Sequence, residues 1–153
     1  MNQIAKLLPP DDVVVGLEAS SKKRVFEQAG LLFENKYGIS RAAVYEALFE
    51  REKIGSTGLG HGIAVPHGRI SGLKEARGAF LRLATPVQFD APDGKPAEMI
   101  FVLLVPESAS KQQDHLNLLA ALAEQFSNRA FREKLAAATD AATIHALFAA
   151  CPD

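Results

Sequence analysis

The sequence predicts an α/β fold, and three observations support this class. Apolar residues recur at helical spacing in several segments of the 153-residue chain. Short apolar runs of strand length separate those segments. Hydrophobic residues make up 48% of the chain, which is enough to bury a core without disulfide staples. We therefore expect a single domain that spans residues 1–153.

The first half of the chain is expected to contain one strand followed by two helices. The apolar run Val13–Val15 predicts the strand. Ser20 is expected to cap the first helix, and Ser40 is expected to start the second. The second helix is expected to end near Arg51 and to lead into a glycine-rich loop. The apolar residues at helical spacing in the first helix are Val25, Phe26, Ala29, Leu32 and Phe33.

The second half is expected to contain two strands and then three helices. The strands are predicted over residues 79–83 and 99–105, joined through a turn-like segment over residues 90–94. The second of these strands is apolar throughout, so it is expected to be central and buried on both faces. The helices are predicted over 111–126, over 129–137 after Asn128, and over 141–149 after Asp140.

Residues 55–69 combine several glycines, two histidines and a short apolar strand. Pro66 lacks an N–H group and biases the preceding residue toward extended geometry, so the strand Ile63–Val65 is expected to end there and to present His67. Glycines let the backbone approach a bound group closely, and successive exposed N–H groups can bind an anion. The segment therefore predicts a phosphate site. Its expected cradle residues are Ser56, Thr57, Gly58 and Gly60.

The same glycines do not fit the nucleotide-binding motifs. The spacing of Gly55 and Gly60 matches a Walker A loop, but His61 and Gly62 stand where Lys and Ser or Thr are required. The dinucleotide fingerprint fails as well, because its third glycine is missing at the proper offset. A phosphoryl group bound without a nucleotide is the better interpretation.

A longer signature is filled by Glu52, by Leu59 and Gly60, by Ile63–Pro66, and by His67 and Gly68. On these residues the chain resembles the mannitol/fructose-type enzyme IIA domains of the bacterial phosphoenolpyruvate-dependent phosphotransferase system. The resemblance spans nearly the whole chain, and the segments 54–58 and 66–69 are most similar to the nitrogen-regulatory enzyme IIA branch. It implies a mixed β-sheet flanked by helices on both faces.

The resemblance also implies that His67 accepts a phosphoryl group from the phosphohistidine of an HPr-like carrier protein. It places Arg51 beside the phosphate as a stabilising cation and His115 in the site as a positioning, hydrogen-bonding imidazole. Ser110 and Gln113 have the form of a capping box, which would put His115 in the second turn of a helix. Without the resemblance, the helical pattern favours a solvated arginine at position 51 and a core-edge histidine at position 115.

Three functions are compatible with these residues. The first is a phosphocarrier with a regulatory output, whose target is a protein such as a sensor kinase or an ion transporter. The second is a sugar-specific enzyme IIA that donates phosphate to a separate IIB component. The third is a metal-dependent hydrolase that uses His61, His67 and His115, which is disfavoured because their spacing matches no recognised ligand pair. We therefore expect no metal and no cofactor.

Composition and charge exclude several classes of partner. The chain carries 17 Lys and Arg against 18 Asp and Glu, so a basic face that grips nucleic acid is not expected. No segment approaches the roughly 20 consecutive apolar residues that span a bilayer. The single cysteine, Cys151, cannot form an intramolecular disulfide, which suits a reducing compartment. The sequence thus predicts a cytoplasmic protein that neither binds nucleic acid nor inserts into a membrane.

Overall fold

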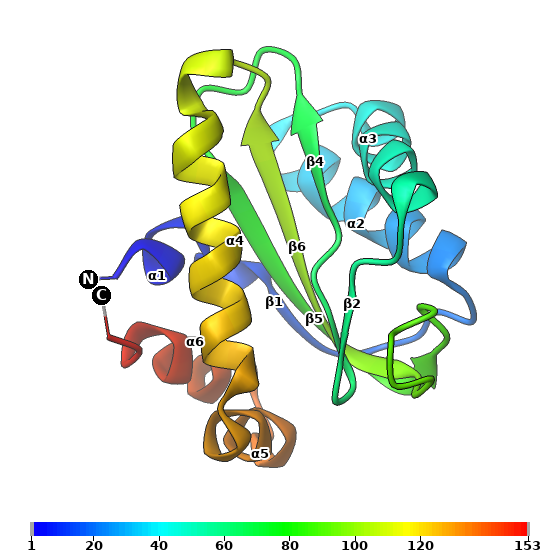
Figure 1. Ribbon diagram of the computed structural model, residues 1–153, viewed down its shortest axis with the longest axis vertical. Coiled ribbons are helices and arrows are strands. Elements are labelled where there is room, and N and C mark those ends of the chain that lie inside the picture. The colour runs from blue at the N-terminus through cyan, green and yellow to red at the C-terminus, as the bar shows by residue number, and fades with distance from the viewer. Residues whose placement is uncertain (1, 153) are drawn as a thin grey trace.

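The computed structural model describes residues 2–152, and these residues form one mixed β-sheet of six strands (Figure 1). The strand order is β1-β5-β6-β3-β2, and β4 pairs with β6 beyond the end of β3. Strand β6 runs antiparallel to β5 and parallel to β3 and β4, while β1 runs parallel to β5. The strands are β1 (Val13–Leu17), β2 (Gly58–Gly60), β3 (Ile63–Ala64), β4 (His67–Ile70), β5 (Arg77–Val87) and β6 (Ala97–Pro106).

Helices cover both faces of the sheet, which confirms the expected architecture (Figure 1). Helices α2 (Lys22–Tyr37) and α3 (Arg41–Ile54) pack on one face. Helices α1 (Gln3–Leu7), α4 (Gln112–Ser127), α5 (Arg129–Ala137) and α6 (Ala141–Ala149) pack on the other. Two 3₁₀ turns, η1 (Pro10–Asp12) and η2 (Ala109–Lys111), precede β1 and α4. Within residues 2–152, the helices are all too short or too polar to cross a bilayer.

Strand β6 is the centre of the core, as its apolar sequence predicts. Successive side chains of a strand point to opposite faces, so β6 contributes to both hydrophobic clusters. Met99, Phe101, Leu103 and Val105 pack toward α4 and α6. Ile100, Val102 and Leu104 pack toward α2 and α3. Each such fully buried side chain contributes about 1.5–3 kcal/mol relative to an exposed one, so this strand anchors both layers of helices.

Three of the predicted helix starts are confirmed in atomic detail. In each case a side-chain oxygen accepts a backbone N–H of the first turn, as an N-cap does. The caps are Ser40 to Ala43 at 3.3 Å, Asn128 to Phe131 at 3.0 Å and Asp140 to Thr143 at 2.7 Å. The helices over residues 129–137 and 141–149 have the predicted bounds.

Two other helix starts differ from the prediction. The cap of α2 is Ser21 rather than Ser20, and its hydroxyl accepts the Arg24 N–H at 3.2 Å. The predicted capping box of Ser110 and Gln113 is absent, because α4 starts at Gln112 without a side-chain cap. Ser110 instead lies in the 3₁₀ turn η2, where a turn of tighter pitch replaces the extended residue that a capping box requires. His115 is consequently the fourth residue of α4.

Pro66 interrupts a strand rather than ending it. Strand β3 stops at Ala64, one residue earlier than expected, and pairing with β6 resumes at His67, the first residue of β4. Proline has no N–H to donate to the ladder, although its carbonyl still accepts the Leu103 N–H at 3.0 Å. His67 therefore opens a strand next to the interruption. Helix α3 also runs past Arg51 to Ile54.

Helix α1 is absent from the sequence-based prediction, and the buried side chain of Asn2 explains its formation. The Oδ1 atom of Asn2 accepts the Ala5 N–H at 2.7 Å and caps the helix. Its Nδ2 atom donates to the carbonyls of Phe148 and Cys151, each at 2.8 Å. A single amide thus fastens the amino-terminal segment to the end of α6.

Candidate functional site

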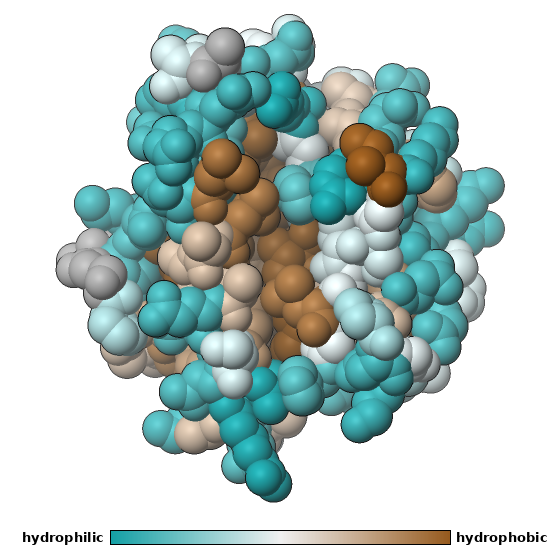
Figure 2. All heavy atoms as spheres, viewed as in Figure 1, coloured by the Kyte–Doolittle hydropathy of each residue, from teal (hydrophilic) through white to brown (hydrophobic). Residues whose placement is uncertain are grey.

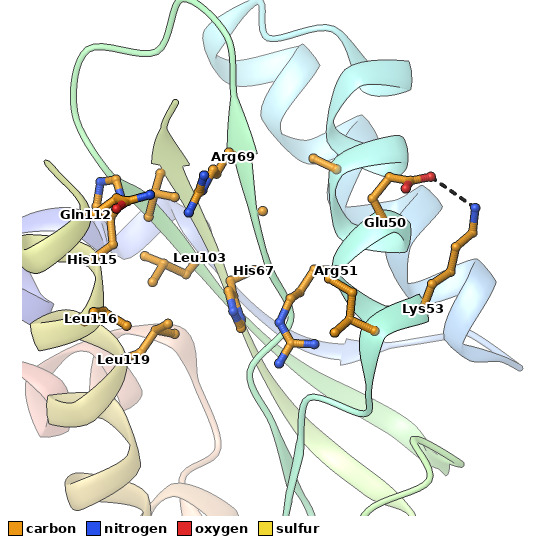
Figure 3. Close-up of a pocket in the computed structure, with 14 residues that line it drawn as sticks. Glu50, Arg51, Lys53, His67, Arg69, Leu103, Gln112, His115, Leu116 and Leu119 are labelled. Atoms are coloured by element: carbon orange, nitrogen blue, oxygen red, sulfur yellow. Dashed lines mark hydrogen bonds and ion pairs between the residues drawn. The ribbon is translucent and has the colours of Figure 1, made fainter. Parts of the chain in front are cut away.

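A cavity of about 910 Å³ lies between α3, β4 and α4, and His67, Arg51 and His115 all line it. In Figure 3, His67 stands on β4 between Arg51 on the α3 side and His115 on α4. These three residues are far apart in the sequence, and the mixed sheet brings their elements together. The other lining residues are Ala47, Glu50, Lys53, Ile54, Gly68, Arg69, Leu103, Val105, Gln112, Leu116 and Leu119.

Side chains alternate between the two faces of β4 and β6, and this alternation determines which residues form the floor of the cavity. His67 pairs with Leu103 and Arg69 with Val105, and all four residues line the cavity. The intervening Gly68 faces α3, where a β-carbon would lie 2.8 Å from the Ala47 side chain. Only glycine allows β4 to lie this close to α3. The spacing of His67 and Arg69 therefore places both on the α4 face of the sheet.

The half-buried ring of His67 is held by a backbone carbonyl. Its Nδ1 atom lies 2.9 Å from the carbonyl oxygen of Val65, which lies in the interruption between β3 and β4. A carbonyl oxygen only accepts hydrogen bonds, so in this contact the ring proton resides on Nδ1. The neutral ring then carries its lone pair on Nε2. Nε2 is thus the ring nitrogen whose lone pair is free.

The surroundings also keep the His67 ring neutral. Burial lowers the pKa of His67 below its ordinary value of 6.5, and the positive charge of Arg51 lowers it further. The hydrogen bond to Val65 and the negative charge of Glu52 act in the opposite direction without reversing the shift. An imidazole must be neutral to act as a nucleophile, so His67 is competent at neutral pH.

Arg51 lies beside His67 in the last turns of α3 (Figure 3). Its Nη1 atom donates to the carbonyl oxygen of Gly55 at 2.8 Å, which satisfies a carbonyl just beyond the helix end. Within residues 2–152, no carboxylate forms an ion pair with Arg51. Its positive charge is therefore available to an anion bound at His67.

His115 presents an unsatisfied ring nitrogen at the opposite wall. The residue as a whole is only 8% exposed, and within the described part of the chain its Nε2 atom is buried without a hydrogen-bond partner. Burial lowers the pKa of His115, and the charges of Arg69 and Lys111 reinforce the effect against the opposing charge of Asp114. Leaving such a group unpaired costs about 1–3 kcal/mol, which a bound hydrogen-bonding ligand would recover.

The four residues predicted to form a phosphate cradle lie outside this cavity. The Ser56 hydroxyl donates to the carbonyl of Phe89 and accepts the Gly58 N–H at 3.0 Å. Thr57 donates its hydroxyl to Glu52 at 2.6 Å. Gly58 packs on Ala91, and Gly60 lies beside the Asp93 carboxylate. The segment forms a hairpin against residues 89–93, so its glycines serve close packing and its hydroxyls are already paired.

Glu52, a residue of the signature, connects three segments that lie near the site. Its side chain is 4% exposed and forms an ion pair of 3.0 Å with Lys22 at the start of α2. It also accepts the N–H of Thr57 at 3.0 Å and the Thr57 hydroxyl. One buried carboxylate therefore joins the end of α3, the start of α2 and the residue that precedes β2. The signature includes Glu52, but the sequence alone did not predict these contacts.

The remaining histidines do not enter the site. His61 lies in the turn between β2 and β3 and has a positive φ of 56°, and its N–H donates to Asp93 at 2.8 Å. His145 lies on α6. Neither lines the cavity, so the histidines of the metal-hydrolase hypothesis are not gathered in one place. Residues 2–152 contain no cluster of three or more His, Cys, Asp or Glu side chains placed to hold a metal ion.

Exposed apolar side chains border the cavity. Ile54 is 83% exposed at the end of α3, and Leu116 is 60% exposed on α4. Figure 2 shows hydrophobic side chains gathered in the hollow at the centre of this face, with hydrophilic surface around them. Ile54, Leu116 and Arg69 are not among the site residues predicted from the sequence. For Arg69 a signal existed, because residues two apart on a strand share a face.

Comparisons with known proteins agree with this geometry. Residues 6–151 match the family model described as the phosphoenolpyruvate-dependent sugar phosphotransferase system, EIIA 2. A nitrogen regulatory protein of Pseudomonas aeruginosa is 40% identical over 146 residues, which cover 95% of this chain and 94% of that protein. The crystal structure of the nitrogen regulatory protein IIA-Ntr from Neisseria meningitidis superposes with a TM-score of 0.89 at 51% identity, covering 95% of this chain and 99% of that one.

A more distant solved structure shares the fold alone. It is the complex of mannitol enzyme IIA and phosphorylated mannitol enzyme IIB from Escherichia coli, in which the matched chain is 20% identical with a TM-score of 0.76. That match covers 95% of this chain and all of the matched chain. The family model spans nearly the whole sequence, and the P. aeruginosa relative exceeds 30% identity. The chain therefore belongs to the EIIA 2 family of the phosphoenolpyruvate-dependent sugar phosphotransferase system.

Proposed function

We propose that this protein is a phosphocarrier that accepts a phosphoryl group on Nε2 of His67 from the phosphohistidine of an HPr-like carrier protein. The observation that carries the proposal is the 2.9 Å contact between His67 Nδ1 and the Val65 carbonyl, because it leaves Nε2 as the free nucleophile. The ring lines an open cavity beside a guanidinium and below an exposed apolar rim. Family membership supports the same chemistry.

The transfer requires little covalent chemistry from the protein. The lone pair on His67 Nε2 attacks phosphorus, and the bond between phosphorus and the donor's ring nitrogen breaks with its electron pair returning to that nitrogen. When the other nitrogen of the donor ring carries a proton, the donor leaves as neutral imidazole. The proton on His67 Nδ1 stays in place, and the ring becomes cationic. The Val65 carbonyl, which already accepts that proton, stabilises the new positive charge.

Arg51 and His115 are assigned complementary roles in this step. Phosphoryl transfer depends mainly on positioning and on stabilisation of the phosphoryl oxygens. The guanidinium of Arg51, beside His67, supplies positive charge to those oxygens. His115 would turn its ring on α4 to donate a hydrogen bond to the phosphoryl group, which would satisfy the Nε2 atom that is otherwise buried without a partner.

The rim of the cavity suits a protein partner. Ile54 and Leu116 expose apolar surface on either side of the His67 cavity. Exposed apolar patches with polar surroundings mark protein interaction sites. The phosphorylated carrier would bury both side chains when it brings its own histidine into line with Nε2.

We also propose that the phosphorylation state acts as a regulatory switch in the cytoplasm. Relatives of this chain are named nitrogen regulatory proteins, which supports an output other than sugar uptake. Phosphorylation adds about −1.5 to −2 charges at neutral pH. On the rim that partners contact, this charge would favour one protein and repel another. A sensor kinase and an ion transporter are the kinds of target that the proposal includes.

Donation to an enzyme IIB component is the alternative. The mannitol enzyme IIA whose fold this chain shares was solved with phosphorylated enzyme IIB. The two outputs are distinguished by incubating the phosphorylated protein with a purified IIB domain. Rapid movement of the phosphoryl group to IIB favours the sugar-specific role, and retention of the group favours the regulatory role.

The acceptance step is tested with phosphoenolpyruvate, enzyme I and an HPr-like carrier, using labelled phosphate. The wild-type protein should acquire one acid-labile phosphoryl group per chain. His67→Ala should acquire none, whereas His61→Ala, which changes a histidine outside the cavity, should be labelled as the wild type is. Circular dichroism confirms that each variant is folded. Full labelling of His67→Ala would overturn the assignment.

A further inference from the structure

Arg69 lines the His67 cavity but has no role in the transfer proposed above. It lies two residues beyond His67 on β4, so the two side chains share the α4 face of the sheet. At the rise of a strand, their Cα atoms are about 6.6 Å apart. The intervening Gly68 faces away, toward α3. The strand thus points an arginine side chain into the same cavity as the nucleophile.

The guanidinium of Arg69 is unlike the others in this protein. Across residues 2–152, Arg69 alone among the arginines has no hydrogen bond, ion pair or aromatic ring as a partner. The others contact carboxylates (Arg24, Arg41, Arg129), backbone carbonyls (Arg51, Arg82, Arg132) or the ring of Tyr37 (Arg77). Arg69 is also exposed, so its charge is accessible from the cavity.

Arg69 and Arg51 approach the cavity from different sides. Figure 3 shows the Arg69 guanidinium directed into the space between β4 and α4, toward Gln112 and His115, while Arg51 lies on the other side of His67. The charge of Arg69 also helps to lower the pKa of His115. The buried, unpartnered nitrogen of His115 lies on this same side. A group bound at Nε2 would therefore stand between two cations.

The oxygens of the phosphoryl group can accept contacts from more than one cation. A phosphoryl group presents three strong acceptor oxygens, and a single guanidinium forms at most a two-pronged contact with them from one side. The cavity is lined by three side chains with permanent positive charge, Arg51, Lys53 and Arg69. Lys53 forms an ion pair with Glu50 at 3.0 Å, whereas the two arginines have no carboxylate partner in the described part of the chain. Arg69 is therefore the second cation of the cavity that is available to the phosphoryl oxygens.

We propose that Arg69 is a further catalytic residue, whose guanidinium contacts the phosphoryl oxygens from the α4 side while Arg51 contacts them from the α3 side. This inference rests on the proposed function, because it requires that His67 carries the phosphoryl group. Two planar guanidinium groups on opposite sides hold the phosphorus in line with Nε2 and stabilise the charge that spreads over its oxygens.

The test compares Arg69→Gln and Arg69→Lys with a matched control, Arg24→Gln, which removes an exposed arginine on α2 outside the cavity. Single-turnover transfer from the phosphorylated HPr-like carrier is measured over a range of carrier concentrations. Arg69→Gln should lower the rate at saturating carrier by about tenfold or more, as expected for loss of a charge-assisted contact made in the transition state. Arg69→Lys should retain part of that rate, and Arg24→Gln should retain all of it.

A second readout excludes a merely structural effect. Because Arg69 has no hydrogen bond, ion pair or aromatic partner within residues 2–152, Arg69→Gln should unfold at the wild-type temperature. The ³¹P resonance of the phosphorylated Arg69→Gln variant should shift relative to that of the wild type, while that of Arg24→Gln should not. The shifted resonance would report the loss of a phosphate contact, and the unchanged melting temperature would exclude a disturbed fold.

Three outcomes would overturn the inference. If Arg69→Gln transfers as fast as Arg24→Gln, Arg69 has no role in the step. If only the half-saturating concentration of carrier rises, Arg69 binds the partner protein rather than the phosphoryl group. If the wild-type protein takes no phosphoryl group on His67, the proposed function fails and this inference fails with it.

Discussion

The buried carboxylate of Glu52 offers the sharpest prediction about stability. In Glu52→Ala, the N–H and the hydroxyl of Thr57 lose their acceptors, which lie at 3.0 and 2.6 Å. A hydrogen bond to a charged group contributes about 1.5–3 kcal/mol, so the loss of two predicts destabilisation by about 3 kcal/mol. The ion pair with Lys22 adds little to this figure, because Lys22 keeps Asp90 as a second partner at 3.3 Å.

The measurement is urea unfolding followed by circular dichroism, because the chain has no tryptophan to report by fluorescence. Glu52→Gln keeps the shape and an acceptor oxygen but loses the charge, so it should cost about 1–2 kcal/mol. Glu50→Ala is the matched control, since its exposed ion pair with Lys53 is expected to contribute about 0–1 kcal/mol. If Glu52→Ala were no less stable than Glu50→Ala, the contacts of Glu52 with Thr57 and Lys22 would contribute nothing to stability.

Three further predictions concern the histidines and the packing of β4. Between pH 7 and pH 5 the free energy of unfolding should fall, because burial holds the pKa values of His67 and His115 below 6.5 and the unfolded chain then binds more protons. Replacing both by Gln should flatten that fall in urea titrations. His61→Asn should raise stability by about 0.5 kcal/mol in thermal melts, because Asn tolerates positive φ in a two-residue hairpin turn. Gly68→Ala should cost about 1–3 kcal/mol, because the new methyl group would meet both the side chain and the backbone carbonyl of Ala47, and Ala47→Gly should not restore stability because the carbonyl contact remains.

Each of these has a result that would contradict it. A wild-type pH profile as flat as that of the double variant would mean that the two imidazoles titrate normally. A less stable His61→Asn variant would mean that the histidine ring itself is needed in the turn. An unchanged melting temperature for Gly68→Ala would show that β4 and α3 do not require glycine at their contact.

Local chemistry explains which elements were predictable. Ser40, Asn128 and Asp140 precede apolar residues at helical spacing, and a capping oxygen acts on the next turn, so the information lies within a few residues. The apolar run of β6 is equally local. Ser110 failed as a cap because the chain adopts a 3₁₀ turn there, and a side chain pattern does not distinguish that turn from the start of an α-helix.

The arrangement of the site depends on contacts between residues that are far apart in the sequence, and such contacts are hard to predict from local patterns. The glycines near residue 58 suggested an anion cradle, but residues 89–93 pack against them, and no local pattern reveals that neighbour. The meeting of Arg51, His67 and His115 in one cavity came from family resemblance rather than from spacing. Arg69 was within reach of sequence reasoning, because strand alternation from His67 predicts its face. Its lack of a partner required the structure.

The most direct test of the account identifies the nitrogen that carries phosphorus. The protein is labelled with ¹⁵N-histidine and phosphorylated through the carrier, and long-range ¹H–¹⁵N spectra are recorded before and after transfer. Before transfer, the His67 ring should carry its proton on Nδ1, in agreement with the contact to Val65. Afterwards, coupling to phosphorus should appear on Nε2 of His67. Phosphorus on Nδ1 of His67, or on another histidine, would contradict the account.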